Sequence, residues 1–375
     1  MGEMKKLAVI GANEPLECFY KQAKQLGYYL IGIAYEKGAV CKKYCDKFYP
    51  ISFADKNAVL EVCRHENIDG ITSFSLESAL PTLIYVANNL GLVTNSFECA
   101  KRLENKYTMR ECFTANAISN PAYIIAKTES ELFNVNISFP CIVKPVDSGG
   151  SQGVTKVNNN EELENAFNRA IEYSRSGSVI IEQFIEGREF SVEYISHNGN
   201  HYFLQITDKV TSGEPYFIEL AHHQPAQVSE ELSDRIKRMV ENALTALNIE
   251  NSASHTEIKL DSKGDLYIIE VGARMGGDYI ASDLVRLSTG YDFVKGVIDL
   301  ALGGFQVPLL KDAKCSGIYF YCSLTPDVKQ YIQLHKNDTA VIEAHLNEIE
   351  NNFCYRNGDR NGYFIYQSDE KIDLK

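Results

Sequence analysis

Two glutamates, Glu257 and Glu270, stand in neighbouring apolar segments with a spacing that could hold a metal ion. The segments HTEIKL (255–260) and LYIIEV (266–271) predict two strands, and Lys263–Gly264 predicts a two-residue turn between them. Counting back from that turn places Glu257 directly opposite Glu270. Like charges so placed repel each other unless a cation lies between them, and magnesium prefers such oxygen ligands. An exposed sheet face with solvated carboxylates, or a slightly different register, is the alternative.

A glycine-rich loop follows a lysine-bearing strand in FPCIVKPVDSGGSQGV, residues 139–154. Lys144 is predicted at the end of a buried strand that Pro145 stops. The loop offers unobstructed backbone N–H groups that can donate to phosphate oxygens, and Lys144 adds a cation. The loop residues expected to bind phosphate are Ser148, Gly149, Gly150, Ser151 and Gly153. The GxxxxGK[ST] pattern of a P-loop is absent, and a plain mobile surface loop is the alternative.

An arginine follows the second glutamate in the sequence VGARMGGD. Arg274 stands among small residues, which suits a bidentate grip on a carboxylate or phosphate. Gly276–Gly277 would let the backbone approach a ligand, and the predicted helix after it could help to bind an anion at its start. Arg286 on that helix is predicted to assist Arg274. A surface arginine beside a turn is the alternative.

The polar segment TDKVTSGEPYFIELAHHQPAQ, residues 207–227, lies between a predicted strand and a predicted helix. We expect it to line an acceptor site, with Lys209, Glu219 and His223 as candidates, whereas solvated loop residues are the alternative. His222 and His223 are adjacent, so on an extended chain they point apart and would not bind one metal ion.

Length and composition limit the classes of protein to which these residues can belong. The 375 residues suffice for two to four folding units. The formal net charge of −13, from 37 Lys and Arg against 50 Asp and Glu, argues against a protein that mainly grips nucleic acid. No apolar run is long enough to predict a membrane span. The ten scattered cysteines suit reduced thiols, so we expect a cytoplasmic location.

The order of predicted elements indicates an α/β protein. Short apolar strands alternate with helices up to about residue 95, which predicts a parallel sheet covered on both faces. Its first turn, GANEP, lacks the GxGxxG dinucleotide pattern. Glu77, at the carboxyl end of this sheet, could reach a substrate. Residues 97–118 are predicted to be helical, and the last 70 or so residues, from 311, predict a small closing subdomain.

These features occur in one order: Lys106, Lys144 with its loop, the strand pair in EQFIEGREFSVE, Glu257, Glu270 and Arg274. That order resembles the ATP-grasp superfamily, and within it the carboxylate–amine ligases, with wider similarity to biotin carboxylase, carbamoyl-phosphate synthase and purine-biosynthetic members. The resemblance covers roughly residues 1–310. It implies a pre-ATP-grasp αβ domain, a two-subdomain clamp and a short closing part. The corresponding ranges are 1–95, 96–180, 181–310 and 311–375.

The resemblance also implies roles in nucleotide binding. Lys106 and Lys144 would contact the phosphates of ATP, with Lys144 also near the adenine edge. The loop from Ser148 to Val154 would close on the triphosphate, and Glu189 would hold the ribose hydroxyls. The residues on the connecting segment, where backbone groups read adenine, would be Glu182, Phe184 and Ile185.

The same resemblance implies a metal and catalytic set. Glu257 and Glu270 would carry magnesium, with manganese as an alternative. Arg274 would face the transferred phosphate or the substrate carboxylate. Lys209 and Arg286, which the sequence itself suggests, are further catalytic candidates.

One position departs from the pattern of the superfamily. Many members have an asparagine two residues after the second metal glutamate, whereas this chain has Gly272. Metal coordination would then depend on the two glutamates and the phosphates.

The function implied is a ligase that uses ATP to convert a small carboxylate into an acyl phosphate, which an amine attacks to give an amide. A mobile loop would exclude water, which would hydrolyse that intermediate. The alternatives are a carboxylase or purine-biosynthetic type of enzyme acting on bicarbonate or formate, and a non-catalytic ATP sensor. The expected partners are small-molecule carboxylate and amine substrates, with no nucleic acid and no membrane, and the resemblance suggests a homodimer.

Overall fold

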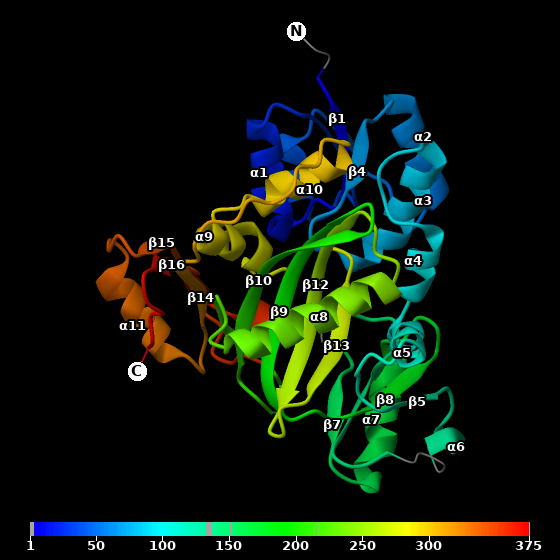
Figure 1. The fold of residues 1–375 in the computed structure, drawn as a ribbon, viewed down its shortest axis with the longest axis vertical. Helices are drawn as coiled ribbons and strands as arrows, with labels where there is room; N and C mark the ends of the chain where they lie inside the picture. Colours follow the sequence, from blue (N-terminus) through cyan, green and yellow to red (C-terminus); the bar gives the residue numbers. More distant parts are fainter. Residues whose placement is uncertain (1–3, 133–136, 151, 215, 375) are drawn as a thin grey trace.

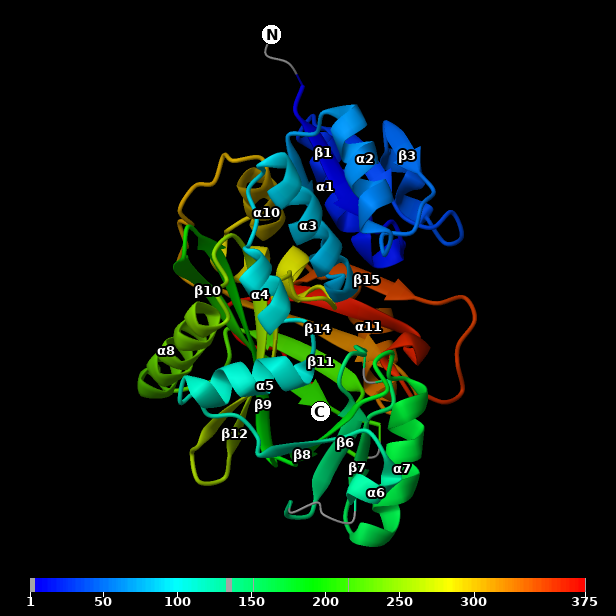
Figure 2. The same ribbon diagram turned by 90° about the vertical axis from the view of Figure 1, so that its right-hand side faces the viewer.

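Three sheets organise the computed structural model, which describes residues 4–132, 137–150, 152–214 and 216–374 (Figures 1 and 2). The first sheet is parallel, in the order β3-β2-β1-β4. Its strands are β1 (Lys6–Ile10), β2 (Tyr29–Ile33), β3 (Lys47–Tyr49) and β4 (Gly70–Thr72). The helices between them are α1 (Glu17–Gln25), α2 (Lys56–Glu66) and α3 (Leu80–Leu90), the last preceded by the short η3 (Glu77–Ala79). The predicted parallel N-terminal sheet is confirmed.

Both faces of this first sheet are buried, as its apolar strands require. Leu7 and Val9 share a core with residues of α1 and of α10 (Phe293–Ala301), which comes from the far end of the chain. Ala8 and Ile10 share a second core with residues of α2 and α3. The N-terminal sheet is therefore packed against a helix that follows the candidate site in sequence.

The stretch 97–118, which the sequence predicts to be helical, contains two helices. α4 (Phe97–Arg102) and α5 (Lys106–Ala115) are separated because Asn105 adopts an extended conformation and caps α5. Its side chain accepts from the Thr108 N–H at 3.0 Å, and the Thr108 hydroxyl accepts from the Asn105 N–H at 3.3 Å. This capping box starts α5 with Lys106 in its first turn.

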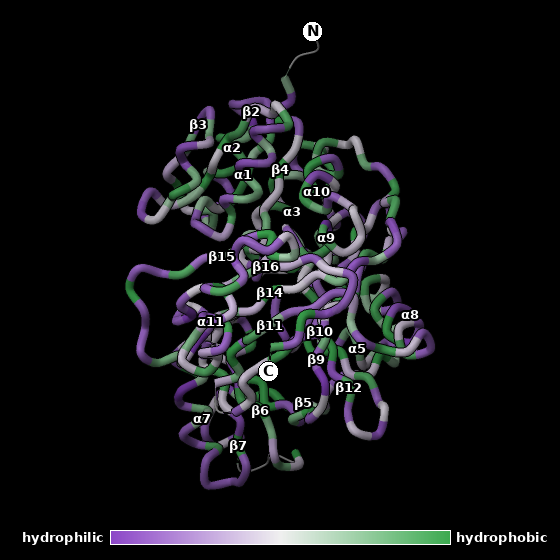
Figure 3. Tube along the Cα trace, turned by 90° about the vertical axis from the view of Figure 1, so that its left-hand side faces the viewer, coloured by the Kyte–Doolittle hydropathy of each residue, from purple (hydrophilic) through white to green (hydrophobic). Residues whose placement is uncertain are grey.

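The second sheet is antiparallel and small, in the order β5-β8-β6-β7. Its strands are β5 (Tyr123–Ala126), β6 (Cys141–Pro145), β7 (Thr155–Val157) and β8 (Val179–Gln183). α7 (Asn160–Glu172) packs on it through Leu163, Ala166, Phe167 and Ala170, at helical spacing. The helix α6 (Glu129–Leu132) is short, and residues 133–136 after it lie outside the described part of the chain. Figure 3 shows hydrophilic residues along the outer turns of β7 and α7.

The third sheet is antiparallel, with the order β13-β12-β9-β10-β11-β14-β16-β15. Its strands are β9 (Gly187–His197), β10 (Asn200–Thr211), β11 (Glu219–Gln224), β12 (Ser252–Asp261), β13 (Leu266–Gly272), β14 (Cys315–Tyr321), β15 (Val341–Leu346) and β16 (Gly362–Ser368). α8 (Glu230–Ala246) lies across one face (Figure 1), where its apolar residues share a core with β9, β12 and β13. The opposite face meets α10, the π-helical η4 (Ile280–Leu284) and α9 (Val285–Thr289).

The segment 311–375, predicted as a small closing subdomain, contributes β14, β15 and β16 to this third sheet and adds α11 (Pro326–His335). β11 was not predicted as a strand. It pairs with β10 on one side and β14 on the other, and so joins the last segment to the rest of the sheet. No helix in the described part of the chain is long and apolar enough to cross a membrane.

Candidate active site

The two glutamates face each other on β12 and β13, as the sequence predicts: Glu257 pairs with Glu270. The predicted two-residue turn is wrong, because the Asp261 N–H donates to the Asp265 carbonyl at 3.0 Å and leaves three residues, 262–264, in the loop. A bulge beside Glu257 then shifts the register by one residue. The longer turn and the bulge shift the register in opposite directions. Glu257 therefore still pairs with Glu270, although the turn was predicted wrongly.

Each glutamate is held by a different lysine. Lys106 Nζ lies 3.1 Å from Glu270 Oε1 and also donates to the Ser148 carbonyl at 2.9 Å. Lys209 Nζ lies 2.9 Å from Glu257 Oε1. Burial alone would raise the pKa of Glu270, but Lys106 and Lys144 together outweigh it and lower that pKa, while Lys209 holds the pKa of Glu257 well below its ordinary value. Both carboxylates are therefore ionised and turned toward cations.

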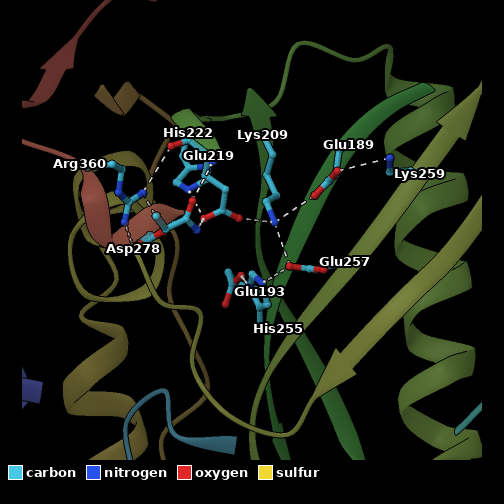
Figure 4. Close-up of polar contacts among 11 residues, drawn as sticks. Glu189, Glu193, Lys209, Glu219, His222, His255, Glu257, Lys259, Asp278 and Arg360 are labelled. Carbon is cyan, nitrogen blue, oxygen red and sulfur yellow. Dashed lines mark hydrogen bonds and ion pairs between the residues drawn. The ribbon is translucent and has the colours of Figure 1, made fainter. Parts of the chain in front are cut away.

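Lys209 is the centre of a larger cluster, shown in Figure 4. Its side chain is 3% exposed, and its Nζ also lies 3.2 Å from Glu189 Oε1 and 2.8 Å from Glu219 Oε1. Burial would lower the pKa of Lys209, but the surrounding carboxylates raise it well above its ordinary value. Glu189, the predicted ribose ligand, is shared with Lys259 Nζ at 3.6 Å.

A second buried cluster surrounds Glu182 on β8. Lys144 Nζ lies 2.7 Å from Glu182 Oε2, and Arg110 Nε lies 2.8 Å from Oε1. Burial would raise the pKa of Glu182, but the two cations outweigh it and lower the pKa to about 2. The predicted adenine-reading segment follows: the Phe184 N–H donates to the Pro140 carbonyl at 3.2 Å, and Ile185 is buried.

The glycine-rich loop lies where Lys106 can reach it. Ser148 accepts from Lys106 through its carbonyl and donates from its hydroxyl to the Tyr173 carbonyl at 2.5 Å. A Cβ added at Gly149 or Gly150 would meet no atom within 4 Å, so this part of the loop borders open space. Gly150 and Gly153 have φ of 65° and 70°, which favours glycine. Ser151 lies outside the described residues.

Arg274 follows β13 in the chain and reaches toward the first sheet. Its Nη2 is 3.9 Å from Glu77 Oε2, and its Nη1 donates to the Met275 carbonyl at 3.0 Å. Among the described residues its buried Nε has no hydrogen-bond partner. A Cβ at Gly272 would come within 3.1 Å of that Nε. The glycine, at the position where many members of the superfamily have asparagine, therefore makes room for the arginine side chain.

Arg286, grouped with Arg274 from the sequence, lies on α9 and pairs with Asp283 at 3.5 Å. Its side chain is 45% exposed. The contacts described for Arg286 thus place it in a separate ion pair rather than beside Arg274.

Several residues of the site were missed by reasoning from the sequence. His255 Nδ1 makes a short hydrogen bond to the buried Glu193, while its Nε2 lies 3.7 Å from Glu257 Oε1. Burial would lower the pKa of His255, but Glu193 raises it to about 9. His255 and Glu257 are two apart on a strand and so share a face, which was an available signal. Arg360 lies far along the chain, and no sequence pattern links it to its partner, Asp278.

The fold and this arrangement define the class of protein. Residues 137–283 match the model of the ATP-grasp domain. The chain therefore contains an ATP-grasp domain, and the resemblance predicted from the order of its motifs is confirmed.

Individual proteins that are similar to this chain include ligases. The chain is 26% identical over 314 residues to an alanine–anticapsin ligase of Bacillus subtilis, an alignment that covers 76% of this chain and 66% of the relative, so the chain spans just under two thirds of that protein's length. The structure superimposes on an L-amino acid ligase from Bacillus licheniformis with a TM-score of 0.80 and 26% identity, covering 99% of this chain and 95% of the other. An N5-carboxyaminoimidazole ribonucleotide synthetase, at 16% identity and a TM-score of 0.79 over 99% and 94% of the chains, shares the fold.

Proposed function

We propose that this chain is an ATP-dependent ligase that joins a small-molecule carboxylate to an amine. The carboxylate attacks the terminal phosphate of ATP to give an acyl phosphate and ADP, and the amine then displaces phosphate to give an amide. The observation that carries the proposal is the pair of opposed glutamates, Glu257 and Glu270, in an ATP-grasp domain, each beside its own lysine. Relatives named as amino-acid ligases support it.

The residues present fit ATP and magnesium. Two ionised carboxylates on adjacent strands offer the oxygen ligands that magnesium or manganese takes. Lys144 and Lys106 offer cations, and the loop from Ser148 to Gly153 offers N–H groups, to bind phosphates. When bound, the metal would neutralise the phosphate oxygens and favour transfer.

The protein's own residues then have distinct tasks. Lys144 and Lys106 orient the triphosphate, and Glu189 binds the ribose hydroxyls. Arg274, with its Nε free of partners in the described residues, binds the substrate carboxylate or the phosphoryl group in transfer. Closure of the glycine-rich loop excludes water from the acyl phosphate. Arg286 was grouped with Arg274 from the sequence, but we propose no direct catalytic task for it.

The remaining assignments are proposals of the same standing. We propose the four domain ranges given above, a homodimer, since one structural relative is described as a dimer, and a cytoplasmic location, which the ten free cysteines suit.

The test is an ADP-release screen over pairs of carboxylates and amines, with mass detection of products. Glu270→Gln should abolish ADP release and leave the unfolding temperature close to that of the wild type, because the substitution removes charge and keeps shape. The matched control, Glu231→Gln on the exposed face of α8, should release ADP normally. Normal turnover by Glu270→Gln would contradict the proposed metal pair. ADP release with bicarbonate or formate, and with no carboxylate–amine pair, would favour the carboxylase or purine-biosynthetic alternative, since formate-dependent relatives also match the chain.

A further inference from the structure

Glu193 is a fully buried carboxylate on β9, on the face of the third sheet that also carries Glu257. The neighbouring strands place His255 on one side of it and Gln205 on the other, in the row next to that of the metal glutamates. A buried carboxylate loses its hydration, and well-packed apolar side chains often stabilise a core as much as a buried ion pair does. The position of Glu193 therefore points to a role in the site rather than to stability.

One oxygen of Glu193 orients the ring of His255 (Figure 4). The distance from Glu193 Oε1 to His255 Nδ1 is 2.5 Å, and Nδ1 is the donor because a carboxylate oxygen accepts. This hydrogen bond fixes the ring with its Nε2 3.7 Å from Oε1 of Glu257. Groups behind a metal ligand determine its orientation and its affinity for the metal. Glu193 thus reaches the metal ligand Glu257 through His255.

The other oxygen of Glu193 holds the chain that follows β13. Residues 273–279, which we call the Arg274 loop, run from the end of β13 to η4. The Gly276 N–H donates to Glu193 Oε2 at 3.3 Å. A Cβ added at Gly276 would lie 2.8 Å from His255 Nδ1 and 3.0 Å from Glu193 Oε1, so only glycine permits this close approach. The middle of the loop is therefore fastened to the same carboxylate that orients His255.

A conformation that costs free energy is built into the Arg274 loop. Asp278 and Tyr279 have φ of 48° and 64°, in the left-handed region that non-glycine residues avoid. Residues keep such a conformation only where the surrounding structure holds the chain. Arg360 holds Asp278 near the end of the loop, at 2.7 and 3.1 Å, and Glu193 holds the middle. The position of Arg274 therefore depends on anchors outside the loop.

We propose that Glu193 is a positioning residue that holds Glu257, through His255, and Arg274, through Gly276, in one fixed arrangement before the substrates bind. This inference rests on the proposed function, because it takes Glu257 as a metal ligand and Arg274 as the residue that binds the group in transfer. Both residues would act on the same phosphoryl group. A site whose charges are already in place avoids the cost of rearranging them during the reaction, and one shared carboxylate keeps the two in register.

The first test compares two dissociation constants measured by titration calorimetry, that of ADP with EDTA and that of ADP with manganese. Manganese takes the same oxygen ligands as magnesium. The ratio of the first constant to the second reports the metal site, while the first alone reports the rest of the nucleotide site. Glu193→Met keeps the length of the side chain and removes both acceptors. It should lower the ratio about tenfold and leave the affinity for ADP with EDTA unchanged.

Two further variants separate positioning from a general effect on the sheet. Gln205→Met is the matched control, because Gln205 lies in the same row on the next strand and donates to Ser288 Oγ at 3.0 Å. It should keep the ratio of the wild type. His255→Asn retains an amide nitrogen that can donate to Glu193 but removes Nε2, so it should lower the ratio as Glu193→Met does. If Glu193→Met does not fold, His255→Asn decides by the same ratio.

The second test concerns the Arg274 loop and uses the carboxylate–amine pair that the ADP-release screen identifies. Gly276→Ala places a Cβ against Glu193 and His255, so the loop must move away from its anchor. We expect kcat to fall about tenfold and the KM for ATP to stay unchanged, because the residues that bind the triphosphate are untouched. Gly304→Ala, where an added Cβ has room, should keep the kcat of the wild type.

The outcomes separate this inference from the proposed function. A ratio near one in the wild type would contradict the metal pair of the proposed function, and the inference with it. A high ratio in the wild type that Glu193→Met and His255→Asn both keep would overturn the inference alone. Equal losses in Glu193→Met and Gln205→Met would also overturn it, because they would show a structural role only.

The activity measurements divide in the same way. No ADP release with any carboxylate–amine pair would contradict the ligase function, whereas a reduced ratio in Glu193→Met and His255→Asn would still support the positioning role at the metal ligand. An unchanged kcat in Gly276→Ala would overturn the link between Glu193 and Arg274.

Discussion

The Glu182 cluster and the Lys209 cluster are built from the same kinds of residue in opposite proportions. In the first, one carboxylate lies between two cations, Arg110 and Lys144. In the second, one ammonium group lies among three carboxylates, those of Glu189, Glu219 and Glu257. The first therefore has positive charge to spare and the second negative charge, although both are buried.

This difference indicates what each side of the site can bind. Surplus positive charge suits the phosphates of a nucleotide, and surplus negative charge suits a cation such as the proposed magnesium ion. The net charge of −13 says nothing of this division, because it sums over the whole chain. Buried groups determine the field in the site, since water screens them little.

The largest effect is expected from removing the ammonium group of the second cluster. Lys209→Met should lower the free energy of unfolding by about 3–5 kcal/mol, because three carboxylates are left without their shared partner. Urea unfolding measures it. Lys259→Met removes a lysine from the same Glu189 and should cost less than about 1 kcal/mol. Equal losses in the two variants would show that Lys209 has no central role.

The first cluster should respond less strongly to the opposite change. Glu182→Gln leaves Arg110 and Lys144 without their carboxylate, and we expect a loss of about 2–4 kcal/mol in urea unfolding. Added ATP should recover part of it, because phosphates can replace the lost charge. Exposed Glu186→Gln is the control. If ATP stabilised Glu182→Gln no more than it stabilises the control, the proposed nucleotide role of the first cluster would fail.

A pH dependence is expected beside the second cluster. The pKa of His255 is raised from 6.5 to about 9, so its protonated form stabilises the fold fully below pH 6.5, and this contribution is lost as the pH rises through about 9. This shift in the pKa of His255 corresponds to about 3 kcal/mol. The free energy of unfolding of the wild type should fall over this pH range more than that of His255→Gln. The exposed control His65→Gln should show the same pH dependence as the wild type. Parallel curves for wild type and His255→Gln would contradict the ion pair with Glu193.

The smallest effect on stability is expected at Gly272. An added methyl group would press on Arg274, so Gly272→Ala should change the unfolding free energy by about 1 kcal/mol or less and lower kcat several-fold. The KM for ATP should stay unchanged, since Lys144 and Lys106 are untouched. Gly304→Ala, where the added Cβ has room, serves as the control. An unchanged kcat in Gly272→Ala would contradict the proposed role of Arg274 in catalysis.

The fold was largely predictable wherever the pattern is local. The bounds of α2 have local causes, because Asp55 caps its start and Asn67 adopts the left-handed conformation after its end. β11 was missed because its residues, including two adjacent histidines, are polar yet buried by pairing with β10 and β14. Polar residues become buried in this way only when distant segments supply partners.

The sequence by itself determined the α/β class, the order of the nucleotide-binding motifs and the opposition of Glu257 to Glu270. Each of these follows from periodicity, turn chemistry or motif order within short stretches of chain. Only the tertiary structure decided which charges meet: Arg110 with Glu182, Lys209 with three glutamates, and Arg360 with Asp278. Such pairs join residues far apart in the chain, and their energies depend on burial and on distances of a few ångströms. Those quantities exist only once the sheets have packed.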